Sequence, residues 1–190
     1  LGERNKAAAS AIFSKTLLFV AVYGAVVIGL GLVFEEELFS GLGATEELFP
    51  VMAEYYQIMM PLLFPQLITI ALYFFVRLDG FPNLAAAALV IGSALNVVLD
   101  YLFIAEYGWG LTGAAVATGL SHALTMLVLL VYFLRPQREL RFNIRQDNWS
   151  EVLQAAYNGV SEFINEVSGG IIAFIFNWLL IQRAGVNGVA

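Results

Sequence analysis

The sequence predicts an all-α polytopic membrane protein, a transmembrane bundle of about five helices, and two observations carry this prediction. The first is composition, since 60% of the 190 residues are hydrophobic, 13% are charged, and the mean hydropathy is +0.80. A soluble domain of this size would leave much of that apolar surface in contact with water. The second is pattern: the apolar runs are long and do not alternate with period two, which favours helices over a β-barrel.

The apolar residues fall into separate segments long enough to span a bilayer. A helix needs about 20 apolar residues to cross a hydrocarbon core about 30 Å thick. We expect spans near residues 16–34, 55–76, 82–105, 107–134 and 149–182. Pro61 and Pro65 lie inside the second span, where they predict a kink or a packing feature. Close helix–helix contacts are expected at Gly24, Gly29, Gly31, Gly113, Gly119, Gly169 and Gly170.

The charges predict an orientation. With five spans, one side of the membrane receives Arg4, Lys6, Lys15, Arg77, Arg135, Arg138, Arg141 and Arg145. The opposite side receives Arg183 and Glu35, Glu36, Glu37, Glu46, Glu47, Glu54 and Glu106. The positive-inside rule therefore predicts a cytoplasmic chain start in a plasma or inner membrane. The net charge of −6 argues against a nucleic-acid partner. The polar connection 135–148 is expected to be a solvated loop or, alternatively, a lipid-headgroup site.

Polar groups inside the third and fourth spans are candidates for function, because charged groups in a membrane usually face a cavity or a partner. Asp100 and Asn96 share a helix face, so the Asn96 amide can hydrogen-bond the carboxyl group. Such a pair suits proton exchange or binding of a small hard cation such as sodium. Thr118 is expected at the same depth, one turn from His122, which can relay protons. Alternatively, Asp100 reaches interfacial water, Thr118 bonds its own helix, and His122 only packs.

Glu162 and Glu166 share a face early in the fifth segment and are candidates for lining a path for a cationic substrate. The alternative is that both glutamates lie at the membrane interface. The chain has one histidine and no cysteine, and it lacks the common phosphate-binding, dinucleotide and hydrolase motifs. We therefore expect neither an enzyme nor a resident cofactor or structural metal.

Several motifs together resemble the multidrug and toxic compound extrusion (MATE) family. The most specific is the run from Asn96 through Asp100 and Tyr101, followed by the glycine-rich stretch Gly108-Trp109-Gly110-Leu111-Thr112-Gly113. Three further stretches fit the same family pattern: Leu1-Gly2-Glu3, Arg77-Leu78-Asp79-Gly80-Phe81-Pro82, and Gly159-Val160-Ser161-Glu162-Phe163.

The resemblance implies a fold of twelve helices in two lobes, of which this chain corresponds to the third to seventh. Residues 1–134 would then be the last four helices of the first lobe, 135–148 the cytoplasmic interlobe loop, and 149–190 the first helix of the second lobe. The family's first-lobe cation site matches Asn96, Asp100 and Thr118. The implied function is antiport of organic cations against protons or sodium, with the remaining helices of the parent chain and the lipid bilayer as partners.

Two other functions compete with this interpretation. A flippase for lipid-linked oligosaccharides, from the same superfamily, would favour a cationic cavity for its anionic pyrophosphate. The intramembrane charges here are acidic, which favours the antiporter. A non-transporting membrane scaffold is the second alternative, and it gives no role to a carboxyl group buried at Asp100.

Overall fold

The computed structural model describes residues 5–42, 44, 49–135, 138–143 and 149–184. The predictions made for Arg4, Glu46, Glu47 and Arg145, and for the opening Leu1-Gly2-Glu3, lie outside these described residues. The chain divides into two compact units, Leu1–Asn148 and Trp149–Ala190, and each is described by itself.

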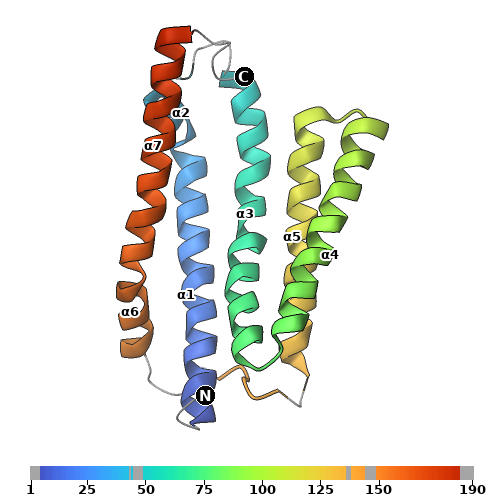
Figure 1. Ribbon diagram of the computed structural model, residues 1–190, viewed down its shortest axis with the longest axis vertical. Helices are drawn as coiled ribbons and strands as arrows, with labels where there is room; N and C mark the ends of the chain where they lie inside the picture. The colour runs from blue at the N-terminus through green and yellow to red at the C-terminus, as the bar shows by residue number, and fades with distance from the viewer. Residues whose placement is uncertain (1–4, 43, 45–48, 136–137, 144–148, 185–190) are drawn as a thin grey trace. The chain divides into compact units, whose positions relative to one another are not determined.

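The first unit is built from long helices that run alternately up and down (Figure 1). Its elements are α1 (Lys6–Val33), α2 (Glu35–Gly41), α3 (Phe49–Leu78), α4 (Pro82–Asp100), the π-helical turn η1 (Tyr101–Glu106) and α5 (Gly110–Leu134). The second unit contains α6 (Trp149–Asn158) and α7 (Val160–Ala184). Five stretches of helix among the described residues are long and apolar enough to cross a membrane, which confirms the predicted all-α transmembrane fold.

The helices differ most from the predicted spans at the start of α1, after α1 and in the fifth segment, and α3 also begins six residues earlier than expected, at Phe49. Helix α1 begins at Lys6 rather than near Thr16, because the Asn5 side chain accepts a hydrogen bond from the Ala8 amide and caps it. After the first predicted span, Glu35–Gly41 forms the short helix α2, which the sequence did not predict and whose first-turn glutamates suit the positive end of a helix dipole. The fifth segment is interrupted at Gly159, between α6 and α7.

The first unit buries several polar groups and leaves many large apolar side chains exposed, unlike a typical soluble domain. Ser14, Lys15, Thr69, Ser121 and Thr125 are buried, and Lys15 is only 2% exposed. Large aliphatic and aromatic side chains on α1, α3, α4 and α5 are exposed. This distribution fits a hydrocarbon solvent, in which helices associate through small residues and hydrogen bonds.

The two ends of the first unit differ in charge and in packing. The basic end carries the start of α1, the α3–α4 turn and the end of α5, with Lys6, Arg77, Arg135, Arg138 and Arg141. The acidic end carries α2 and the α4–α5 turn, with Glu35, Glu36, Glu37, Glu54 and Glu106. The main cluster of buried apolar residues belongs to the basic half and includes Phe13, Leu72, Val76, Leu129, Tyr132, Phe133 and Leu140.

Helix α3 is the centre of the bundle, because it packs against α1, α4 and α5. It continues as one α-helix through Pro61 and Pro65. Glycines on its neighbours allow close approach: a Cβ at Gly119 would lie 2.4 Å from a Leu62 methyl carbon, and one at Gly31 would meet Met60 and Tyr56. Gly24 likewise meets Leu67 of α3 and Gly113 meets Phe103 of η1, whereas a Cβ at Gly29 would have nothing within 4 Å. Gly169 and Gly170 belong to the second unit, so their packing role stays a prediction.

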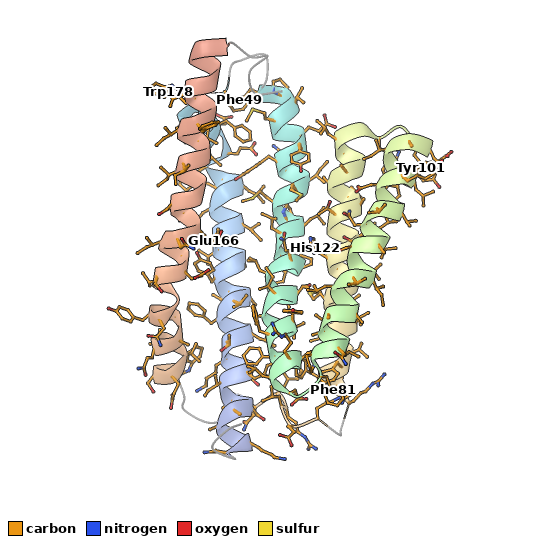
Figure 2. All side chains as sticks on the ribbon, viewed as in Figure 1. Phe49, Phe81, Tyr101, His122, Glu166 and Trp178 are labelled. Atoms are coloured by element: carbon orange, nitrogen blue, oxygen red, sulfur yellow. The ribbon has the colours of Figure 1, made fainter. Side chains whose placement is uncertain are left out.

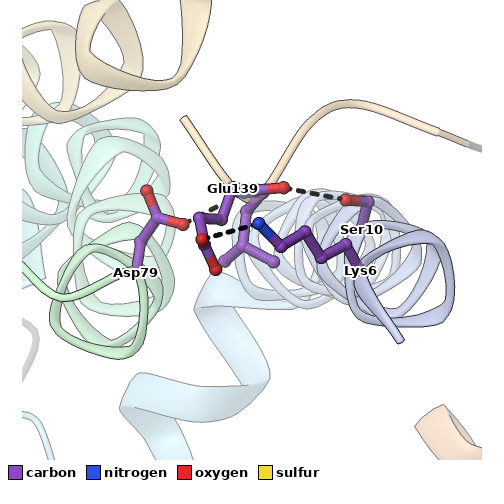
Figure 3. Close-up of polar contacts among 5 residues, drawn as sticks. Lys6, Ser10, Asp79 and Glu139 are labelled. Carbon is purple, nitrogen blue, oxygen red and sulfur yellow. Dashed lines mark hydrogen bonds and ion pairs between the residues drawn. The ribbon is translucent and has the colours of Figure 1, made fainter. Parts of the chain in front are cut away.

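Residues 138–143, here called the strap, cross the basic end and are held by the side chains of Asp79, Ser10 and Ser14; Figure 3 shows the first two beside Glu139 of the strap. The buried Asp79 carboxylate accepts hydrogen bonds from the Tyr132 hydroxyl at 2.7 Å and from the Leu140 amide at 3.0 Å. The hydroxyl oxygen of Ser10 accepts from the Arg141 amide at 3.1 Å, and that of Ser14 accepts from the Asn143 amide at 2.7 Å. Leu140 is 2% exposed, so the strap is part of the folded bundle rather than the solvated loop expected from sequence.

The Asp79 contacts predict a stability difference between two substitutions. Asp79→Ala should lower the free energy of unfolding by about 2–4 kcal/mol, because two buried donors lose their acceptor. Tyr132→Phe removes only one donor and should cost about 1 kcal/mol. Unfolding of the detergent-solubilised parent protein, followed by intrinsic fluorescence, measures both. Equal losses in the two variants would contradict the role given to the Leu140 amide.

Packing between α4 and α5 predicts a second stability difference. A Cβ at Gly92 would lie 2.2 Å from the Thr125 hydroxyl oxygen, while one at Gly29 meets nothing within 4 Å. Gly92→Ala should therefore destabilise the protein by about 1–3 kcal/mol through overpacking. Gly29→Ala is the matched control and should be neutral or slightly stabilising, since alanine favours the helix. Thermal unfolding midpoints in one detergent compare the two variants. Similar midpoints would show that α4 and α5 can move apart to accommodate the added methyl group without a loss of stability.

Candidate functional site

The candidate site lies where α4 faces α5. Asn96 is on α4, and its side-chain amide donates a hydrogen bond to the Thr118 hydroxyl oxygen on α5 at 3.4 Å. These two residues can meet because α4 and α5 are antiparallel and joined by a short turn, so Thr118 lies level with Asn96 along the bundle. The structure therefore brings together two of the three residues expected to form the cation site. The sequence suggested that the Asn96 amide would bond Asp100, but the described hydrogen bond goes to Thr118.

Asp100 is the last residue of α4, directly before the π-helical turn η1. Its side chain is partly buried, and its Oδ1 atom is inaccessible and has no hydrogen-bond partner among the described residues. A buried carboxylate oxygen without a donor is costly, so a proton or a bound cation would stabilise it. Single π-helical turns inside membrane and soluble helices are frequently found at functional positions.

A small polar cavity adjoins the Asn96–Thr118 contact. It has a volume of about 80 Å³, and its polar lining residues are Ser93, Asn96, Ser121, His122 and Thr125. Two of the hydroxyls donate to backbone carbonyls, Ser121 to Thr118 at 2.8 Å and Thr125 to Ser121 at 2.7 Å. Their oxygens can still accept hydrogen bonds, and a polar space of this size can hold ordered water.

His122 lies about midway along α5 (Figure 2) and lines this cavity together with Asn96. Its backbone carbonyl accepts a hydrogen bond from the Thr69 hydroxyl of α3 at 3.3 Å, which fixes this part of α5 against its neighbour. The imidazole is half-buried. The cavity therefore places the only histidine of the chain beside the candidate cation site.

Glu162 and Glu166 belong to α7, in the second unit, and are exposed within that unit. They lie one helical turn apart, as expected from their spacing. Their role in a substrate path stays a prediction, because the two units are described separately.

The residues around Asn96 have the chemistry of a site for a small hard cation. The Asp100 carboxylate, the Asn96 amide oxygen and the Thr118 hydroxyl are oxygen ligands, which sodium and similar cations prefer. Among the described residues, no group of three or more histidine, cysteine or acidic side chains is arranged to hold a metal ion. The site thus suits a proton or a weakly held monovalent cation.

Sequence reasoning missed Ser93, Ser121, Thr125 and the π-helical turn. A signal for the polar residues was present, since Thr118, Ser121, His122 and Thr125 follow helical spacing and form one polar stripe along an apolar span. The π-helical turn has no such signal, because its residues Tyr101–Glu106 are ordinary for a helix end.

Comparisons with known proteins agree on one family. A model of the MatE family matches residues 1–102 of this chain. The multidrug export protein MepA of Staphylococcus aureus (strain bovine RF122 / ET3-1) is 24% identical over 181 residues, covering 88% of this chain and 39% of MepA. The chain therefore spans well under half the length of this curated relative.

Solved structures give the same result. The inward-facing conformation of a multidrug resistance MATE family transporter of the MOP superfamily superposes with a TM-score of 0.88 at 28% identity, covering 99% of this chain and 43% of that one. The outward-facing conformation of a multidrug resistance MATE family transporter superposes with a TM-score of 0.85, also at 28% identity, over 99% and 42% of the two chains. With its matching family model, its five apolar helices and this shared fold, the chain belongs to the multidrug and toxic compound extrusion (MATE) family of transporters.

Proposed function

We propose that the chain is part of a cation-coupled multidrug efflux antiporter, which exports organic cations in exchange for protons or sodium. The observation that carries this proposal is the Asp100 carboxylate, which has a buried oxygen without a hydrogen-bond partner among the described residues. It lies one helical turn from Asn96, which contacts Thr118. Relatives named as multidrug export proteins support the substrate class.

The coupling ion would act at Asp100. A proton or sodium ion neutralises the carboxylate and removes the cost of its buried, unpartnered oxygen. Asn96 and Thr118 would orient the carboxylate or share in binding the cation. The adjoining cavity with His122 offers water and an exchangeable imidazole for proton movement.

Ion binding and drug binding would be coupled because each changes the affinity for the other. Transport would follow by alternating access, in which binding or release of the ion at Asp100 changes the packing of the helices around it. Two features support a change at the acidic half: the buried apolar cluster and the strap hold the basic half, whereas Asp100 is the last residue of α4, toward the opposite end.

The basic end is proposed to face the cytoplasm of the cell, across the plasma or inner membrane, following the positive-inside rule. Lys6, Arg77, Arg135, Arg138 and Arg141 all belong to that end. The second candidate, a flippase for lipid-linked oligosaccharides, would need cationic groups within the membrane, and the candidate site instead contains an acid.

Replacement of the candidate carboxylate tests the proposal. Asp100→Asn in the full-length parent, reconstituted in liposomes, should abolish efflux of a fluorescent cationic dye under an imposed proton or sodium gradient. Glu106→Gln is the matched control, because Glu106 is an exposed carboxylate whose Oε1 accepts from the Tyr101 hydroxyl at 2.8 Å. Full dye movement in Asp100→Asn would reduce Asp100 to a structural role, and no movement in the folded parent would favour the flippase.

Removal of the Thr118 hydroxyl tests how the site holds its ion. Thr118→Val should raise the coupling-ion concentration needed for half-maximal efflux about fivefold, the equivalent of one lost hydrogen bond worth about 1 kcal/mol. Thr112→Val, which removes a hydroxyl that donates to Glu54 Oε1 at 3.1 Å away from the cavity, is the control. Comparing efflux rates across proton and sodium concentrations identifies the ion, and an unchanged requirement in Thr118→Val would exclude the hydroxyl from the site.

A further inference from the structure

A second, larger cavity opens between the strap and the first turns of α1. It has a volume of about 610 Å³, and its charged lining residues are Lys6, Arg138, Glu139 and Arg141. Figure 3 shows Lys6 and Ser10 of α1 both reaching Glu139, with a Lys6–Glu139 ion pair of 2.8 Å. Three cationic side chains and one acidic side chain thus line one cavity, and the acidic one is paired with Lys6.

Arg138 is the most constrained of these cations. Its guanidinium carbon lies 3.9 Å from the centre of the Tyr132 ring and 4.5 Å from that of Phe81. The Nε atom is buried and has no hydrogen-bond partner among the described residues. Stacking on aromatic faces holds a guanidinium in one plane, and its planar donors match the oxygens of a phosphate group.

The cavity has a fixed wall. The Ser10 hydroxyl oxygen accepts from the Arg141 amide, and Asp79 accepts from the Leu140 amide, so the backbone beside Arg138 and Arg141 is tied to α1 and to the α3–α4 turn. A site whose backbone is already held loses less conformational entropy when a ligand binds.

The wall is also partly apolar. Phe142 lines the cavity and is 48% exposed, while its ring packs 5.2 Å from that of Phe13. An exposed aromatic ring beside cationic side chains suits an amphiphile at a membrane surface better than a free inorganic anion.

We propose that this cavity binds the phosphate-bearing headgroup of an anionic phospholipid. Arg138 and Arg141 would contact the phosphate oxygens, and Phe142 would lie against the glycerol and upper acyl region. The placement in the cytoplasmic leaflet rests on the orientation proposed above, where anionic lipids attract basic residues next to transmembrane helices. The headgroup would tie the strap to α1 at the basic end of the bundle.

The test measures lipid binding to the full-length parent in detergent, by native mass spectrometry with phosphatidylglycerol, phosphatidylcholine and inorganic phosphate as separate probes. We expect the parent to bind phosphatidylglycerol at least about fivefold more tightly than phosphatidylcholine, since each basic residue near the surface contributes about a fivefold gain. Arg141→Gln should weaken phosphatidylglycerol about fivefold and leave phosphatidylcholine unchanged.

Two further variants guard against misfolding and general charge effects. Arg138→Lys keeps the charge but loses the planar donors, so it should weaken phosphatidylglycerol while retaining the unfolding midpoint within a few degrees. Arg77→Gln removes a cation of the basic end that stacks on Tyr73 outside this cavity, and it should bind both lipids as the parent does.

Equal affinity of the parent for the two lipids would overturn the proposal, as would unchanged phosphatidylglycerol binding in Arg141→Gln. Inorganic phosphate that displaces phosphatidylglycerol at equal concentration would also overturn it, in favour of a site for a free anion. Because the readout is lipid binding rather than dye efflux, its failure is distinguishable from failure of the proposed antiport.

Discussion

In a hydrocarbon solvent these helices cannot associate by hiding apolar surface from water, so the bundle depends on close backbone approach and on satisfied polar groups. Helix α3 makes both kinds of contact. Leu62 fills the space left by Gly119 of α5, and Thr69 donates to a backbone carbonyl of the same helix. The exposed aliphatic surface is then free to face lipid. Most of the folded first unit follows from this constraint, including its buried serine and threonine side chains.

By the same reasoning, the basic half of the first unit is the part with more satisfied polar groups and closer packing. Asp79 is the one acid of the α3–α4 turn, and its two oxygens join α5 to the strap through Tyr132 and Leu140. Apolar packing around Phe13 closes the space behind them. The acidic half has a different character, with a polar cavity at mid-depth and a carboxylate oxygen of Asp100 that no described side chain satisfies. Stability and the candidate chemistry are therefore placed at different depths of one bundle.

Hydropathy and charge were sufficient to predict the all-α membrane fold, and the helical spacing of Asn96 and Thr118 with the short α4–α5 turn was sufficient to predict that they would meet. The strap was not predictable in this way. Its polar residues are typical of a solvated loop, and only the three-dimensional position of Asp79 and Ser10 shows which of its amides are held. The prediction of where α1 starts failed for a related reason. In the sequence, the charged Lys15 stands directly before the predicted span 16–34, but in the structure it is a buried residue within α1.

The π-helical turn after Asp100 explains how α4 can close on α5 at the acidic end. A π-helical turn shifts the register of the helix, so the side chains that follow it no longer continue the face of Asn96 and Asp100. It brings the backbone of Phe103 toward Gly113, where an added Cβ would lie 3.1 Å from the Phe103 carbonyl carbon. The Phe103 ring stacks on Trp109 at 5.0 Å, which closes the turn between the helices. Asp100 is thus the last residue of regular α-helix, so in the proposed antiport a change in its charge would act directly beside η1, whose hydrogen bonding departs from the regular pattern.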